Sequence, residues 1–228
     1  MNDRLKILMV TRLFPSIATP TRGTFCLERA RALSKLADLR VICPTPYVPA
    51  FMARRGGRAA ILAAIGQSSR TDFGVPVSYP RFFSFPKVLT FTQGLTMARA
   101  VRREFVATCG DWTPDVVDGH FAFPDGYSAV RLARWLHLPA TVTCHGSDLR
   151  DYPPLQVSRR LLQWTLRSAD AVIGVSRWLT RAAVDLGCPP EHAQFLSNGV
   201  DCEIFALRNQ AVAADNYLER SATTIVSG

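Results

Sequence analysis

Apolar runs of strand length alternate with helical patterns along most of the chain. The runs are apolar almost throughout, which is typical of parallel strands covered on both faces. They are LKILMVT (5–11), LRVIC (39–43), a run near 75–79, DVVDGH (115–120), PATVTC (139–144), ADAVIGVS (169–176) and the short HAQFLSNGV (192–200). Helical patterns cover residues 24–37, 91–108, 126–136, 155–167 and 178–186. This order predicts a doubly wound, parallel, Rossmann-like α/β sheet.

Residues 50–65, AFMARRGGRAAILAAI, interrupt this rhythm by mixing basic and apolar side chains around two glycines. The basic residues are Arg54, Arg55 and Arg58, and the large apolar residues are Phe51, Met52, Ile61 and Leu62. Two interpretations stay open for this segment. It is either an ordinary surface insertion or a basic amphipathic patch that rests on an anionic membrane.

A second pattern change follows residue 205, where a polar, poorly patterned stretch leads to the β-branched run TTIVSG (223–228). We interpret residues 1–205 as one Rossmann-like domain. Residues 206–228 are predicted to be a linker and the first strand of a second domain, most of which the chain does not contain.

Composition narrows the classes of protein. The chain has 228 residues, 48% of them hydrophobic, and a net charge of +9, which favours anionic partners. No run approaches the roughly 20 apolar residues that cross a bilayer, and the apolar part of the start is too short for a signal peptide. The six cysteines are scattered, without zinc or disulfide spacing. We expect a cytoplasmic location, and no nucleic-acid-binding motif accompanies the charge.

Polar residues gather just after the predicted strands, where the ligands of open parallel sheets bind. Those with the clearest chemistry are Gly23, Thr24, His120, Asp125, His145, Gly146, Ser147, Asp148, Ser176, Asn198 and Asp201. Each also has an ordinary structural interpretation. Gly23 and Asn198 suit turns, while Asp125 and Ser176 suit helix N-caps. Capping does not, however, require histidine at two strand ends.

Three kinds of site are disfavoured. Two histidines with Asp148 or Cys144 lack a third metal ligand at suitable spacing, so we expect no metal. The sequence around Ser176 lacks the second glycine of the G-x-S-x-G nucleophile turn. The loop after the first strand carries one glycine, Gly23, instead of the G-x-G-x-x-G of dinucleotide enzymes.

In this order and spacing, the motifs resemble the N-terminal domain of family 4 glycosyltransferases, which have the two-domain GT-B architecture. The matching stretches are FPSIATPTRGTFCLERARAL, DVVDGHFAFPDGYSAVRLARWLHLPATVTCHGSDLR, ADAVIGVSRWLTRAAVDLGC and FLSNGVDCEIF. The basic residues and the glutamate pair that the family carries in its C-terminal domain do not follow Asn198. The resemblance therefore implies an acceptor-side domain with an incomplete donor site.

The resemblance implies roles for individual residues. His145 and Asp148 would be catalytic, with His145 beside the donor sugar and Asp148 either holding the loop or contacting a sugar. The implied substrate-binding residues are Gly23, Thr24, His120, Gly146, Ser147, Ser176 and Asn198, with His120 on the acceptor side.

The implied reaction is retaining hexosyl transfer from a nucleotide-sugar to a cell-surface polysaccharide or lipid-linked acceptor, without a cofactor. We expect this chain to be inactive by itself. The alternative is a non-catalytic α/β module that binds a sugar or phosphate at the same edge of the sheet.

Overall fold

The computed structural model describes residues 4–66, 68–71, 73–84, 91–152 and 156–199. Contacts divide the chain into the units Met1–Ser197 and Asn198–Gly228. The predicted boundary at residue 205 and the predicted strand at 223–228 lie outside the described residues, so this domain division stays a prediction.

The first unit is built on an eight-stranded sheet in the order β10-β9-β8-β7-β1-β2-β5-β4. All neighbouring strands pair in parallel except β4, which is antiparallel to β5. The strands are β1 (Lys6–Val10), β2 (Asp38–Ile42), β4 (Ser68–Arg70), β5 (Pro76–Ser78), β7 (Val116–His120), β8 (Ala140–Cys144), β9 (Ala171–Gly174) and β10 (Ala193–Phe195). The seven parallel strands are those predicted, and the Rossmann-like fold class is confirmed.

The five predicted helices are all present. They are α1 (Thr24–Ser34), α4 (Thr92–Thr108), α5 (Tyr127–Leu136), α7 (Gln156–Ser168) and α8 (Arg177–Asp185). Residues 50–65 contain the short helices α2 (Ala50–Ala53) and α3 (Gly57–Ala64). The pattern did not predict the short elements α6 (Ser147–Asp151), the π-helical turn η1 (Ala122–Gly126), the 3-10 turn η2 (Pro190–His192), and the two-stranded parallel pair β3 (Thr45–Pro46) and β6 (Arg81–Phe82). Among the described helices, none is long and apolar enough to span a membrane.

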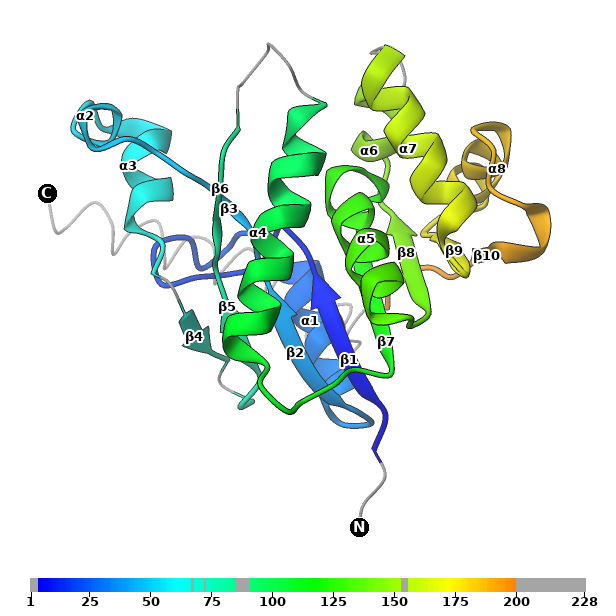
Figure 1. Cartoon of the computed structure of the whole chain (residues 1–228), viewed down its shortest axis with the longest axis horizontal. Helices are drawn as coiled ribbons and strands as arrows, with labels where there is room; N and C mark the ends of the chain where they lie inside the picture. Colours follow the sequence, from blue (N-terminus) through cyan, green and yellow to red (C-terminus); the bar gives the residue numbers. More distant parts are fainter. Residues whose placement is uncertain (1–3, 67, 72, 85–90, 153–155, 200–228) are drawn as a thin grey trace, which may run out of the picture. The chain divides into compact units, whose positions relative to one another are not determined.

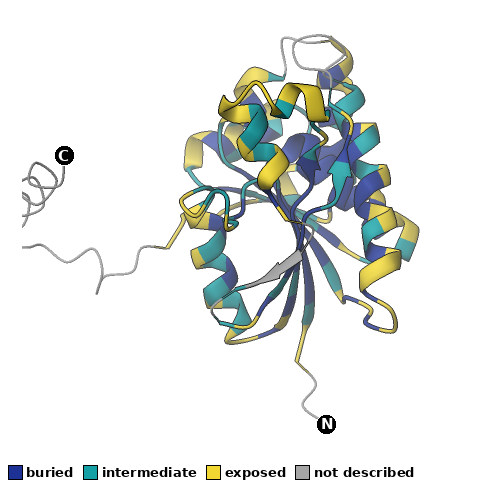
Figure 2. Cartoon of the chain, turned by 90° about the vertical axis from the view of Figure 1, so that its left-hand side faces the viewer, coloured by how far each residue is buried: buried dark blue, intermediate teal, exposed yellow. Residues whose placement is uncertain are grey.

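Alternate side chains of the strands pack into two separate cores. In β1, Leu8 and Val10 belong to a core formed with α4 and α5, whereas Ile7 and Met9 belong to a core formed with α1. Figure 1 shows α4 and α5 in front of the strands and α1 behind them. In Figure 2 the strands are largely dark blue, the colour of buried residues. Burial on both faces explains why the strands are apolar throughout.

Candidate active site at the carboxyl ends of the strands

The parallel register of β7 and β8 brings two histidines together. His120, the last residue of β7, pairs with Thr143, and His145 follows β8 directly. Nδ1 of His120 lies 3.1 Å from Nε2 of His145, and the two rings are stacked. The His120 ring is fully buried, while His145 is partly exposed. Of the two predicted site histidines, His145 is therefore the one that reaches solvent.

The buried carboxylate of Asp118 contacts the ring of His120. Oδ2 of Asp118 lies 3.2 Å from Nε2 of His120, and Oδ1 accepts a 2.6 Å hydrogen bond from Thr141. The guanidinium of Arg29, from α1, lies 3.8 Å from the same carboxylate. Asp118 alternates along β7 with residues of the α5 core, so it faces α1 together with His120. This strand position gives the histidine a counter-charge.

The buried charges move the pKa of the two histidines in opposite directions. Burial opposes the charge of His120, but Asp118 outweighs it and raises the pKa of His120 to about 9. Burial, followed by the charges of His120 and Arg29, lowers the pKa of His145 to about 3. Burial also opposes ionisation of Asp118, yet His120 and Arg29 lower its pKa. At neutral pH, His145 is thus an uncharged ring beside a cationic one.

Two phenylalanines hold the ring of His145. Its centroid lies 4.9 Å from that of Phe25, at the start of α1, and 4.6 Å from that of Phe121, after β7. Phe121 has φ 69°, an uncommon conformation for a residue with a side chain. The side chain of Phe25 remains 37% exposed. The aromatic contacts leave His145 little freedom to rotate.

Asp148 holds the loop that carries His145. Its carboxylate accepts hydrogen bonds from the backbone N–H groups of Ala122 (2.7 Å), Gly146 (2.7 Å) and His145 (3.2 Å). Asp148 is 1% exposed, and burial raises its pKa despite these donors. The sequence leaves two roles open for Asp148, holding the loop or contacting a sugar. The observed hydrogen bonds are those of a residue that holds the loop.

The loop after β1 is tied to the turn after β7 by a buried ion pair. Asp125 accepts from the backbone N–H of Arg12 at 2.7 Å and from its Nε at 3.0 Å. Burial opposes the charge of Arg12, but the Asp125 carboxylate raises its pKa. The sequence allows Asp125 to be the N-cap of α5. In the structure it does not cap this helix, because its carboxylate accepts hydrogen bonds from Arg12.

Gly23 is required by the same β1 loop. Its φ is +71°, and a Cβ atom would lie 2.2 Å from the carbonyl oxygen of Leu13. α1 begins at Thr24 without a side-chain cap or an acidic residue in its first turn. Burial, together with repulsion from Arg12 and Arg58, lowers the pKa of Arg22. This part of the site is therefore cationic.

The remaining predicted site residues have simpler settings. Ser176 caps α8 by accepting from the backbone N–H of Leu179 at 3.1 Å, and Ser147 is exposed as the first residue of α6. Gly146 has φ +121°. Asn198 is exposed and belongs to the second unit, and Asp201 lies outside the described residues. None of these settings tests a contact with substrate, so the predicted binding roles stay predictions.

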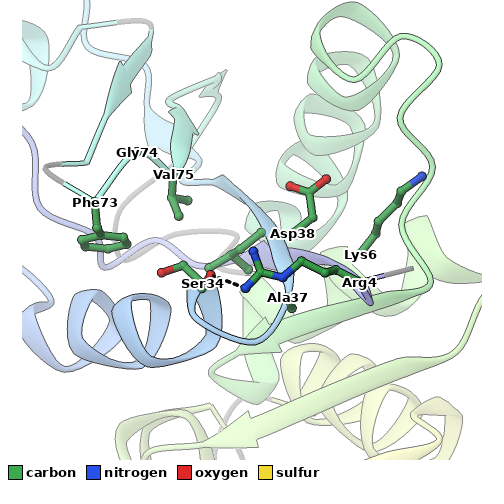
Figure 3. Close-up of a pocket in the computed structure, with 9 residues that line it drawn as sticks. Arg4, Lys6, Ser34, Ala37, Asp38, Phe73, Gly74 and Val75 are labelled. Carbon is green, nitrogen blue, oxygen red and sulfur yellow. Dashed lines mark hydrogen bonds between the residues drawn. The ribbon is translucent and has the colours of Figure 1, made fainter. Parts of the chain in front are cut away.

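No group of three or more His, Cys, Asp or Glu side chains could hold a metal ion in the part of the chain that the structure describes. A hollow of about 390 Å³ lies elsewhere, at the amino ends of β1 and β2 (Figure 3). Two of the charged side chains around this hollow have structural partners. Arg4 donates to the carbonyl of Ser34, and Asp38 accepts from Trp112. The chemistry is therefore concentrated at the carboxyl ends.

The sequence did not predict which residues surround His120 and His145 in the interior of the site. Asp118, Cys26, Arg29 and Phe25 come from β7 and α1, and their proximity to His145 depends on tertiary packing. One signal was present in the sequence. An aspartate inside the apolar run DVVDGH has to find a buried partner.

Solved structures with similar folds agree with the fold class. HepE of Anabaena, in complex with UDP-glucose, has a TM-score of 0.58 at 13% identity, covering 94% of this chain and 49% of that one. A UDP-N-acetylglucosamine 2-epimerase from Rickettsia bellii has a TM-score of 0.50 at 13% identity, covering 86% and 45%. The chain has the Rossmann-like fold of one half of such proteins.

The sequence comparisons then give the family. The model of Glycosyltransferase Family 4 matches residues 23–204. The putative teichuronic acid biosynthesis glycosyltransferase TuaC of Bacillus subtilis (strain 168) is 30% identical over 187 residues, which are 80% of this chain and 47% of TuaC. The chain belongs to Glycosyltransferase Family 4, and it spans about half the length of this relative.

Proposed function

We propose that this chain is the acceptor-side domain of a retaining glycosyltransferase. The enzyme transfers a hexosyl group from a nucleotide-sugar to a cell-surface polysaccharide or lipid-linked acceptor. Family membership, the name of TuaC and the UDP-glucose bound to HepE support this proposal. The observation that carries it is the uncharged, partly exposed His145 fixed at the carboxyl ends of β7 and β8.

The chemistry of such a transfer fits the charges of the site. A departing nucleoside diphosphate gains negative charge while the sugar carbon becomes oxocarbenium-like. Arg22 and the uncapped start of α1 supply positive potential on one side of the site. An uncharged His145 can bond a sugar hydroxyl without repelling the positive carbon. We propose that Asp148 acts by positioning His145, and that no metal ion is needed.

The test is transfer by a two-domain protein that contains this chain. We expect His145→Ala to lower kcat/KM about 100-fold or more, the scale of losing one transition-state contact. His137→Asn is the control, because His137 is exposed at the end of α5 and asparagine tolerates its φ of 58°. Activity of His145→Ala within about threefold of wild type, with both proteins folded, would contradict the proposed role.

We propose that residues 1–228 alone do not transfer sugar, since the part of the chain that aligns with TuaC covers only 47% of the length of TuaC. The alternative is a non-catalytic binding module. It predicts that the two-domain protein, like the chain alone, binds a nucleotide-sugar without turning it over. Incubating each protein with nucleotide-sugars and following nucleotide release distinguishes these cases. Release that persists in excess EDTA would support metal-free transfer.

We further propose a cytoplasmic enzyme that contacts the membrane through residues 50–65. α2 and α3 bury none of their residues, as Figure 2 shows. Phe51, Met52 and Ile61 are exposed by 63%, 42% and 46%, and no acidic residue lies in this segment. We expect sedimentation with anionic vesicles at low salt, and Phe51→Ser/Ile61→Ser should weaken it. Equal sedimentation with neutral vesicles would contradict a charge-assisted contact.

A further inference from the structure

We propose that Asp118 and His120 are positioning residues that hold His145 in one tautomer, with its proton on Nδ1. The N–H of Nδ1 is thereby offered to an oxygen atom of the bound sugar. The part of this inference that concerns a sugar rests on the proposed function, whereas the tautomer is a property of the chain itself.

The carboxylate of Asp118 can only accept hydrogen bonds when it is ionised. Thr141 donates to Oδ1 at 2.6 Å, and the guanidinium of Arg29 lies 3.8 Å from Oδ2. These partners favour the charged form. Nε2 of His120, 3.2 Å from Oδ2, therefore carries a proton and donates it.

The second nitrogen of His120 decides the state of His145. Nδ1 of His120 lies 3.1 Å from Nε2 of His145 and 3.7 Å from Sγ of Cys26. Cys26 has another partner in Oγ1 of Thr11, at 3.6 Å. If His120 is cationic, both of its nitrogens are donors, and Nε2 of His145 must be the acceptor.

The charges around His120 favour the cation. The groups that face it are Asp118 on its own strand, Cys26 on α1 and His145 on the next loop, while Arg29 of α1 lies against Asp118. Asp118 is the one carboxylate among them. The raised pKa of His120 and the lowered pKa of His145 agree with a cation that donates to an uncharged ring.

Nδ1 of His145 is left for a ligand. It makes no hydrogen bond to any residue that the structure describes. Within those same ranges, Oγ1 of Thr143 is the only buried side-chain nitrogen or oxygen without a partner. His145 is also partly exposed to solvent. An N–H on this ring is a stronger donor because the cation behind it polarises the hydrogen bond.

The tautomer can be measured in this chain by two-bond ¹H–¹⁵N correlation of labelled histidines. Only four histidines are present, and the single variants His137→Asn, His145→Gln and His192→Asn identify three of their signals, which leaves the fourth to His120. At pH 7 we expect the imidazolium pattern for His120 and the Nδ1–H pattern for His145. An Nε2–H pattern for His145, or a neutral His120, in the wild-type chain would overturn the proposal without any variant.

Asp118→Asn tests the origin of this state, because it removes the charge while keeping the shape of the side chain. We expect His120 to become neutral at pH 7 and His145 to move its proton to Nε2. Asp115→Asn is the matched control, since Asp115 is an exposed aspartate directly before the same strand. Unchanged histidine signals in a folded Asp118→Asn protein would overturn the role of Asp118.

Transfer by the two-domain protein then separates this inference from the proposed function. If both are correct, Asp118→Asn lowers kcat about 10-fold with little change in KM, and the loss follows the change of tautomer. If the tautomer is as proposed but His145→Ala transfers sugar normally, the proposed function fails while the network stands.

Discussion

The carboxylate of Asp148 accepts a 2.7 Å hydrogen bond from the backbone N–H of Ala122, although 26 residues separate them. Ala122 begins the turn after β7, and Asp148 lies just after β8. The bond therefore fixes the loops of His120 and His145 to each other. The position of the site therefore depends on this carboxylate in addition to the strands.

We predict that Asp148→Ala lowers the free energy of unfolding by about 3 kcal/mol, because it leaves buried N–H groups unpaired. Asp151→Ala is the control. Its ion pair with Arg150 is exposed by 54% and 75%, so the change should be below about 0.5 kcal/mol. Urea denaturation measures both. Equal effects would show that the Asp148 contacts add no stability.

The fold was predictable because the parallel strands are buried on both faces. Runs such as LKILMVT are apolar throughout for that reason, and their order along the chain gave the sheet. The short elements were not predictable from periodicity. α6 is a five-residue helix that follows Gly146 at φ +121°, and it is held by Asp148.

The site was only partly predictable, since strand ends locate the loops without giving the contacts between them. His145 was predictable as a site residue because it follows a strand end, where helix capping alone does not require a histidine. The burial of His120 was missed because it depends on α1, which packs Cys26 and Arg29 over β7. Asp125 was assigned a possible capping role, because its partner Arg12 lies 113 residues away.

We predict that Gly23→Ala is more destabilising than Gly110→Ala. Both glycines have positive φ, at +71° and +49°, but a Cβ atom at Gly110 would meet nothing within 4 Å. Gly110→Ala should therefore cost only the left-handed strain of about 1 kcal/mol. At Gly23 the clash with Leu13 is added, and the cost should exceed about 2 kcal/mol. Comparable thermal unfolding of the two variants would contradict this difference.

The Arg12–Asp125 pair should respond asymmetrically to mutation. The side chain of Asp125 is 0% exposed, whereas that of Arg12 is 25% exposed. Arg12→Met removes the counter-charge of a buried carboxylate and should cost about 3 kcal/mol. Asp125→Asn leaves a cation that reaches water and should cost about 2 kcal/mol or less.

A control pair tests whether burial causes the asymmetry. Glu28 and Arg31 form an exposed pair on α1, so Glu28→Gln should change the free energy of unfolding by less than about 0.5 kcal/mol. If Asp125→Asn proves costlier than Arg12→Met in urea denaturation, the loss of the counter-charge to Asp125 is not the dominant penalty.

The lowered pKa of His145 predicts a pH dependence of stability. Its folded-state pKa is about 3, against 6.5 for the ordinary group. Between these values the unfolded chain binds one more proton at His145 than the folded chain does. The free energy of unfolding therefore falls as pH falls, by up to about 1.4 kcal/mol per pH unit from this residue.

His145→Gln isolates this contribution, because glutamine does not titrate and can still accept a hydrogen bond from His120. Relative to wild type, the variant should gain about 1 kcal/mol of stability per pH unit as pH falls below about 6. Above about pH 7 the difference should be constant, which is an internal control. Urea denaturation across this range measures both limbs. A difference that stays constant down to about pH 4 would mean that His145 protonates in the folded chain as readily as in the unfolded one.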